Sequence, residues 1–325
     1  MKRRDVLKSA GVASAALAGA VGATGVVVDE NWRDAQRQRE LPMRIRWPAD
    51  GQAQPQGGWP LLVFSHGLGG SRAGGEVWGM AWADAGFVVL HVQHAGSDLD
   101  AVRQLPGGFA QVAGLRAVAN AQQWLQRMQD VVFVLDEVVR RQASGAAGWS
   151  EVRPRQVGLS GHSFGAHTTL GMAGQAFPGF AGLQEPRLAA FIALSPAAPA
   201  RFAEQGFATI TRPTLCITGT RDEDVLGNGA TPERRLAVYQ ALPAGNKALL
   251  LLQDADHMSF AGQTGPALEI RARAAISREL QARHHALVAR VSTDWWRASL
   301  TDDAQARARL AQPEGLAAGD VWQRA

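Results

Sequence analysis

Short, continuously apolar segments separated by helical stretches are the feature of this 325-residue sequence that most constrains its fold. Six such segments lie within residues 59–67, 85–94, 155–163, 188–198, 213–224 and 247–257, and residues 39–50 form a less regular early strand. Strands that are apolar along their whole length are buried on both faces, and helices between them provide the cover. We therefore expect an α/β fold with a mostly parallel central sheet and helices on both faces.

Polar side chains follow these apolar segments, at the points where the predicted strands end. In sheets of this kind, chemistry gathers at the carboxyl ends of the strands. The residues found there are His66, His94, Ser163, Ser195, Asp222 and His257. These side chains are therefore the first candidates for a functional site.

Ser163 lies at the centre of the pentapeptide Gly161-His162-Ser163-Phe164-Gly165. A nucleophilic serine needs a base, and the base needs an acid that orients it. Ser163, Asp222 and His257 each follow a different predicted strand, in the chain order Ser, Asp, His that α/β-hydrolases use. We predict that Ser163 is the nucleophile, Asp222 the acid and His257 the base.

Other carboxylates and histidines fit these roles less well. Asp224 is the alternative acid, and Asp254 and Asp256 are expected to shape the loop before His257. The histidines that we set aside as the base are His162 and His167, which are too close in sequence to Ser163, and His284 and His285, which lie in an arginine-rich helical segment and are expected to face solvent.

A tetrahedral intermediate needs main-chain N–H donors for its oxyanion. The residue after the nucleophile normally supplies one donor, and the loop after an early strand supplies the other. Phe164 is therefore the first predicted donor. The glycine-rich loop His66-Gly67-Leu68-Gly69-Gly70 offers Leu68 as the second, with Gly67 as the alternative.

The amino-terminal segment 1–28 has a charged start followed by an apolar stretch of Ala, Gly and Val. Such a layout is typical of a secretory signal, and Lys2-Arg3-Arg4 resembles the start of a twin-arginine export motif. We expect a cleaved signal and a periplasmic or secreted protein, with an uncleaved membrane anchor as the alternative. Residues 29–310 are then expected to form one domain, followed by a loose tail at 311–325. Within the domain, 112–142 is expected to be helical with a break near Asp130, and 262–310 is expected to be largely helical.

The charge distribution argues against a nucleic-acid partner. The formal net charge is +4, and the first eight residues carry +3 of it, which leaves +1 for the rest of the chain. No basic tract or stacking motif follows. The single cysteine, Cys216, lies in an apolar segment and can form no intramolecular disulfide. His91 and His94 would point to opposite faces of a strand, so we expect no metal site there.

With these residues placed, the chain resembles the α/β-hydrolase superfamily. Within it, the chain resembles bacterial predicted dienelactone hydrolases related to platelet-activating-factor acetylhydrolases. The shared motifs are "FSHGLGG", "HAGSD", "DVVFVLDEV", "GLSGHSFGAHTTL", "GTRDED" and "DADHMSF", in that order. The resemblance implies a serine carboxylesterase without a cofactor, acting on small-molecule esters.

Two departures from these families limit what can be transferred. Dienelactone hydrolases use a cysteine nucleophile, whereas this position is Ser163. The acetylhydrolases place their acid after the strand that corresponds to residues 188–194, where this chain has Ser195 and Pro196. The acid must therefore come from the next strand, which again favours Asp222.

The substrate pocket is expected to be apolar. Two of five apolar side chains near the predicted site are expected to line it, the others being core residues; the five are Trp78, Trp82, Phe164, Met258 and Phe260. One alternative function is a phospholipid-type acyl hydrolase that acts at a membrane surface, for which residues 177–183 are the candidate lid. Another is a non-catalytic binding protein on a hydrolase fold. Oligomeric state cannot be read from the sequence.

Overall fold

The computed structural model describes residues 25–199, 203–227, 229–263 and 272–325, and residues 1–24 of the expected signal lie outside them. Nine strands form one sheet in the described chain. They are β1 (Val27–Asp34), β2 (Arg39–Arg46), β3 (Leu61–Ser65), β4 (Val88–Val92), β5 (Val157–His162), β6 (Leu188–Leu194), β7 (Thr214–Arg221), β8 (Lys247–Asp256) and β9 (Val321–Arg324).

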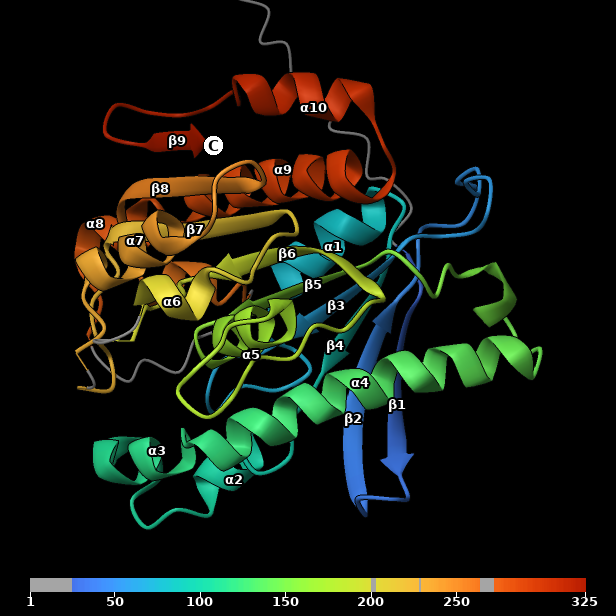
Figure 1. The fold of residues 1–325 in the computed structure, drawn as a ribbon, viewed down its shortest axis with the longest axis horizontal. Helices are drawn as coiled ribbons and strands as arrows, with labels where there is room; N and C mark the ends of the chain where they lie inside the picture. The colour runs from blue at the N-terminus through green and yellow to red at the C-terminus, as the bar shows by residue number, and fades with distance from the viewer. Residues whose placement is uncertain (1–24, 200–202, 228, 264–271) are drawn as a thin grey trace, which may run out of the picture.

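The strand order is β1-β2-β4-β3-β5-β6-β7-β8-β9 (Figure 1). From β4 to β8 the neighbours pair in parallel, whereas β1, β2 and β9 add antiparallel pairs at the two edges. The predicted α/β fold with a mostly parallel sheet is confirmed. Because β3, β5, β6, β7 and β8 are parallel, their carboxyl ends lie at one edge of the sheet.

Helices cover both faces of the sheet, as predicted. They are α1 (Glu76–Asp84), α2 (Leu99–Arg103), α3 (Val112–Val118), α4 (Ala121–Ala143), α5 (Phe164–Ala173), α6 (Ala203–Phe207), α7 (Pro232–Ala241), α8 (Ala275–Glu279), α9 (Gln281–Leu300) and α10 (Ala304–Ala311). Figure 1 shows α4 and α5 on the side of the sheet away from α1 and α9.

Alternate side chains of each strand enter two separate hydrophobic clusters. On β3, Leu61 and Val63 pack with residues of α4, α5 and α7, whereas Leu62 and Phe64 pack with residues of α1 and α9. This two-sided burial explains why the central strands have apolar residues facing both sides of the sheet. Cys216 is fully buried on β7, as expected, and burial raises the pKa of its thiol to about 12.

The long helical segment is not broken where we expected. The helix α4 runs unbroken from residue 121 to 143 through Asp130. The break precedes it, at Asn120, whose side chain accepts a hydrogen bond from Gln123 N–H and caps the helix. Asp130 is tolerated within α4 because its carboxylate points into the fold and receives two hydrogen bonds, both 2.9 Å, from the Arg39 guanidinium.

The two ends of the described chain are more ordered than the sequence suggested. The strand β1 begins at Val27, so the last two residues of the expected signal segment belong to this strand. The segment 311–325 is not wholly a loose tail, because β9 pairs with β8. Trp322 anchors this strand by donating from Nε1 to Leu310 O over 2.9 Å. No helix in the described part of the chain is long and apolar enough to cross a bilayer.

Candidate active site

Ser163 occupies a sharp turn between β5 and α5. Its backbone has φ 55° and ψ −113°, a conformation that costs a non-glycine residue free energy. The turn needs glycine on both sides, since a Cβ on Gly165 would overlap Ser65 O and one on Gly161 would overlap Gly165 O. Ser163 is thereby presented at the carboxyl edge of the sheet, at the amino-terminal end of α5.

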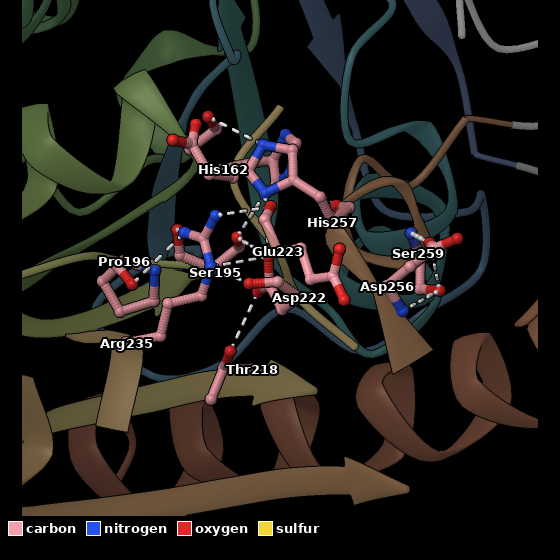
Figure 2. A network of polar contacts seen from close by, with 12 residues as sticks. His162, Ser195, Pro196, Thr218, Asp222, Glu223, Arg235, Asp256, His257 and Ser259 are labelled. Carbon is pink, nitrogen blue, oxygen red and sulfur yellow. Dashed lines mark hydrogen bonds and ion pairs between the residues drawn. The ribbon is translucent and has the colours of Figure 1, made fainter. Parts of the chain in front are cut away.

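The three residues predicted as nucleophile, acid and base lie together at this edge. His257 Nε2 is 3.0 Å from Ser163 Oγ, and His257 Nδ1 is 2.9 Å from Asp222 Oδ1. Asp222 is fully buried and His257 is 6% exposed, so the pair is shielded from water. Figure 2 shows His162 beside His257, and their rings lie 4.8 Å apart at an interplanar angle of 45°.

His257 is held at the start of a short 3₁₀ helix, His257–Phe260, directly after β8. Asp256 caps this helix by accepting from Ser259 N–H over 3.0 Å, and Arg273 donates to the same carboxylate. The other neighbouring acid, Asp254, pairs with Arg221 at 2.6 Å. Asp254 and Asp256 therefore shape this loop, as the sequence indicated.

Besides His257, the Asp222 carboxylate contacts side chains from β7, from α7 and from the end of β6 (Figure 2). Thr218 Oγ1 donates to Oδ2 over 2.9 Å, and Arg235 Nε lies 2.7 Å from Oδ1. Burial alone would raise the pKa of this carboxyl, but the Arg235 guanidinium and hydrogen bonds from His257 and Ser195 outweigh it and hold the pKa below its ordinary value. Asp222 therefore stays ionised beside His257.

Ser195, one of the candidates at the strand ends, is a further member of the site for which the sequence indicated no catalytic role. Its hydroxyl donates to Asp222 Oδ1 over 2.9 Å and lies 2.7 Å from His257 Nδ1. It sits at the end of β6, and its φ is +56°. Its position directly after a strand is the signal in the sequence that indicates it, although a serine there does not by itself suggest a contact with the acid and the base.

Asp224, the alternative acid, points elsewhere. Its carboxylate accepts from Leu226 N–H over 2.8 Å and from Gly229 N–H over 2.5 Å. It therefore orders the loop that follows Asp222, while Asp222 contacts His257.

The glycine-rich loop after β3 leaves two main-chain donors free beside Ser163. Gly69 N–H donates to Ser97 O over 2.9 Å, and Gly70 N–H donates to Gly67 O over 3.1 Å. Within the described chain, the N–H groups of Gly67 and Leu68 have no such acceptor. Phe164 begins α5, so its N–H has no partner within the helix.

A network of buried polar side chains packs next to this loop, at the end of β3. Ser65 Oγ lies 2.9 Å from His94 Nε2, and His94 Nδ1 lies 3.0 Å from Asp130 Oδ2. Arg127 donates to Ser65 Oγ over 3.2 Å. All four side chains are fully buried, so no substrate reaches this second Ser-His-Asp set, and its role is structural.

Several other histidines make contacts within the fold. His162 Nε2 contacts the main-chain oxygen of His257 at 3.0 Å, so this ring nitrogen is not directed to Ser163. His91 contacts Gly74 O at 2.9 Å, remote from the His94 network. His284 and His285 do not face solvent, contrary to our expectation. His284 is fully buried and its Nε2 lies 3.0 Å from Gln253 O, and His285 is half-buried with its ring 5.1 Å from that of Trp78. The described residues contain no cluster of His, Cys, Asp and Glu side chains that could hold a metal ion.

Two cavities open beside Ser163 and His257. One of about 80 Å³ lies along the glycine-rich loop and Met258. The other, of about 520 Å³, lies between Phe164, the start of α4 and residues 177–180. Of the five apolar side chains expected near the substrate, Phe164 and Met258 line these cavities, whereas Trp78, Trp82 and Phe260 are fully buried core residues.

The fold and the serine-centred site define the class of protein: an α/β-hydrolase-type serine ester hydrolase. The chain is similar to the family described as platelet-activating factor acetylhydrolase, isoform II, whose model matches residues 39–104. The match spans β2 to α2 and includes the glycine-rich loop. A search of curated proteins found no match to this chain. The resemblance to dienelactone hydrolases stays a prediction from the motifs.

Proposed function

We propose that this protein hydrolyses carboxylic esters through an acyl-enzyme intermediate on Ser163. Ser163 Oγ attacks the ester carbonyl carbon while its proton passes to His257 Nε2. The tetrahedral intermediate collapses as His257 returns that proton to the departing alcohol. Water then attacks the acyl-enzyme with His257 as base, which releases the acid and restores the serine.

The oxyanion of each tetrahedral intermediate is held by the N–H groups of Leu68 and Phe164. Leu68 is preferred to Gly67 because it borders both cavities that flank Ser163, whereas Gly67 borders only the small one of these two. The amino-terminal end of α5 adds a favourable field for negative charge. Asp222 fixes the His257 tautomer, with the proton on Nδ1, and stabilises the imidazolium that forms.

The observation that carries this proposal is the pair of contacts made by His257. Its two ring nitrogens lie 3.0 Å from Ser163 Oγ and 2.9 Å from Asp222 Oδ1. Both distances are within hydrogen-bond reach, as proton transfer requires. The chain order and the placement after three different strands support the same assignment.

A fluorophosphonate probe tests the nucleophile, and a panel of chromogenic esters tests the activity. We expect labelling of Ser163 and hydrolysis in the folded wild type, and neither in Ser163→Ala. Ser160→Ala is the matched control, because Ser160 lies on β5, the strand before Ser163, and its buried hydroxyl has no hydrogen-bond partner among the described residues. A wild-type protein that neither labels nor hydrolyses any ester would instead support a non-catalytic binding protein.

We also propose that residues 1–28 direct export, so that the enzyme acts in the periplasm or outside the cell. Lys2, Arg3 and Arg4 ahead of an apolar stretch support this proposal. Replacing Arg3 and Arg4 together by lysine should keep the protein in the cytoplasmic fraction, whereas Lys8→Arg should not. Periplasmic recovery of the double variant at the wild-type level would argue against twin-arginine export.

A further inference from the structure

The cavity between Phe164, the start of α4 and residues 177–180, which we call the large cavity, is lined by several aromatic side chains and a histidine. It has a volume of about 520 Å³ and borders Ser163, His257 and Leu68 at one end. This volume is within the usual range for small-molecule sites. Leu125 and Phe177 border it and are 40% and 37% exposed, so the far end opens to solvent.

Three aromatic side chains form one wall of this cavity. The Trp124 ring lies 5.3 Å from Phe177 at an interplanar angle of 82°, and 5.4 Å from Phe180 at 71°. Both are edge-to-face contacts, the arrangement that aromatic rings favour. We call Trp124, Phe177 and Phe180 the aromatic wall.

The aromatic wall is built on a fixed indole. Trp124 Nε1 donates to His167 O over 2.9 Å. The part of the ring next to Nε1 also lies against α5 at Gly171, where a Cβ would come within 2.5 Å of Trp124 Cζ2. The indole therefore needs no reorganisation when a ligand arrives, which lowers the free-energy cost of binding.

His167 gives the same cavity a polar contact. Its imidazole borders the cavity, and burial lowers its pKa to about 4, so the ring is neutral at pH 7. No described residue is hydrogen-bonded to this ring. A neutral imidazole can both donate and accept, so it suits a hydroxyl or carbonyl on a bound molecule.

We propose that the large cavity receives an aromatic ring of the ester substrate, with His167 contacting a polar substituent on that ring. This inference rests on the proposed ester hydrolysis and names the substrate class for the same site. A rigid ring fits a preformed aromatic wall through further edge-to-face contacts. A flexible alkyl chain of the same carbon number loses more conformational freedom on binding.

The ring proposal is tested with four nine-carbon esters assayed by pH-stat. Methyl phenylacetate and benzyl acetate carry a ring on the acid or the alcohol side, and methyl octanoate and heptyl acetate are their linear counterparts. We expect kcat/KM to be at least tenfold higher for the ring ester in one of the two pairs, and that pair identifies the side. Equal or better rates for both linear esters would overturn the proposal and favour an extended, lipid-like chain.

Substitutions in the aromatic wall test whether the preference for ring esters depends on it. Trp124→Leu and Phe177→Ala should reduce the ring-over-linear ratio at least fivefold. Val139→Ala is the matched control, because Val139 is 41% exposed and lies farther along α4. Unchanged ratios in both wall variants would overturn the proposal. Fluorophosphonate labelling of Ser163 in each variant separates a loss of specificity from a failure of the catalytic site.

A second comparison tests His167. The methyl esters of the three hydroxyphenylacetic acids are compared with methyl phenylacetate, or the corresponding benzyl acetates if the ring binds on the alcohol side. At least one isomer should gain fivefold or more in kcat/KM, and His167→Leu should abolish that gain while hydrolysis of the unsubstituted ester continues. If no isomer gains, or if the gain survives in His167→Leu, the assignment of His167 is wrong.

Discussion

A guanidinium nitrogen of Arg127 donates a hydrogen bond to the main-chain carbonyl of His66, which joins α4 to the glycine-rich loop after β3. The same guanidinium lies 4.6 Å above the ring of Phe164, at the start of α5. Arg127 thus touches both elements that carry the proposed oxyanion donors. It is fully buried, so this contact fixes the spacing between Leu68 and Phe164 without meeting the substrate.

Replacing Arg127 should therefore impair the chemical step more than substrate binding. We expect Arg127→Met to lower kcat by about 10²-fold with KM changed less than threefold, since misplacing one oxyanion donor costs about that much. Arg127→Lys should recover part of the loss, because it retains a charge and a donor near His66 O. Steady-state kinetics on a small ester measure both constants. A fall in protein stability with unchanged kcat would show that Arg127 supports only the fold.

The acid of the triad can be identified by a matched pair of substitutions. Asp222→Asn should lower kcat by about 10⁴-fold, the effect known for removing a triad carboxylate without changing its shape. Asp224→Asn should lower kcat less than threefold, because Asp224 binds the main chain of its own loop. The same ester assay serves both variants. A larger effect at Asp224 than at Asp222 would reverse the assignment.

Ser195 should have a smaller effect of the same kind. Its hydroxyl donates to the ionised Asp222 carboxylate and helps to orient Asp222 relative to His257, and a hydrogen bond to a charged group contributes about 1.5 kcal/mol or more. We expect Ser195→Ala to lower kcat by about tenfold with KM little changed. Thr218→Val removes the bond to the other carboxylate oxygen of Asp222 and provides a comparison on the side away from His257. A Ser195→Ala enzyme with wild-type kcat would show that Asp222 needs no help at Oδ1.

The positions of Ser163, Asp222 and His257 could be predicted because each follows a strand whose apolar run is plain in the sequence. The carboxyl ends of parallel strands lie at the same edge of a sheet, so residues that follow such strands are expected to lie close together. The order of the three residues along the chain then suggests which is nucleophile, acid and base. The alternative acid, Asp224, could not be excluded in this way, because it lies only two residues from Asp222. The structure separates them by the direction in which each carboxylate points.

The supporting residues could not be predicted, because they come from distant elements. Arg127 lies on α4 and Arg235 on α7, and their helices show only an ordinary amphipathic pattern. Nothing in a single sequence says that a guanidinium turns inward to meet a carbonyl or a carboxylate. The edge strands were missed for a related reason: β1 and β9 are short or half-exposed and lack a continuous apolar run.

The buried histidines predict that the protein loses stability in mild acid. Burial lowers the pKa of His91 and His162 to about 3, and that of His94 to about 4. In the unfolded chain these rings take up protons near pH 6.5, so below that pH the unfolded state binds more protons than the native state. The free energy of unfolding therefore falls as the pH drops from about 6.5 to about 4, by up to ~1.4 kcal/mol per pH unit for each histidine.

Urea unfolding at pH 7, 6 and 5 measures this loss. His91→Gln should reduce this dependence of stability on pH by the contribution of one histidine, because His91 is no member of the proposed triad and its Nε2 has no hydrogen-bond partner among the described residues. The variant should lose less stability than the wild type between pH 7 and pH 5. Equal losses in the two proteins would show that His91 is not held neutral by the fold.

The strained turn at Ser163 predicts that two inactive variants at this position differ in stability. Its φ of 55° and ψ of −113° place a side chain in a region that favours glycine, at a cost of about 1–3 kcal/mol. Ser163→Gly removes that strain, and Ser163→Ala removes only the hydroxyl, so the difference between these two variants isolates the backbone. We expect both to be inactive and Ser163→Gly to be more stable than Ser163→Ala by about 1 kcal/mol, because the greater freedom of glycine in the unfolded chain offsets part of the gain. Chemical denaturation of the two variants measures this difference. An alanine variant as stable as the glycine variant would mean that the turn holds the nucleophile without strain.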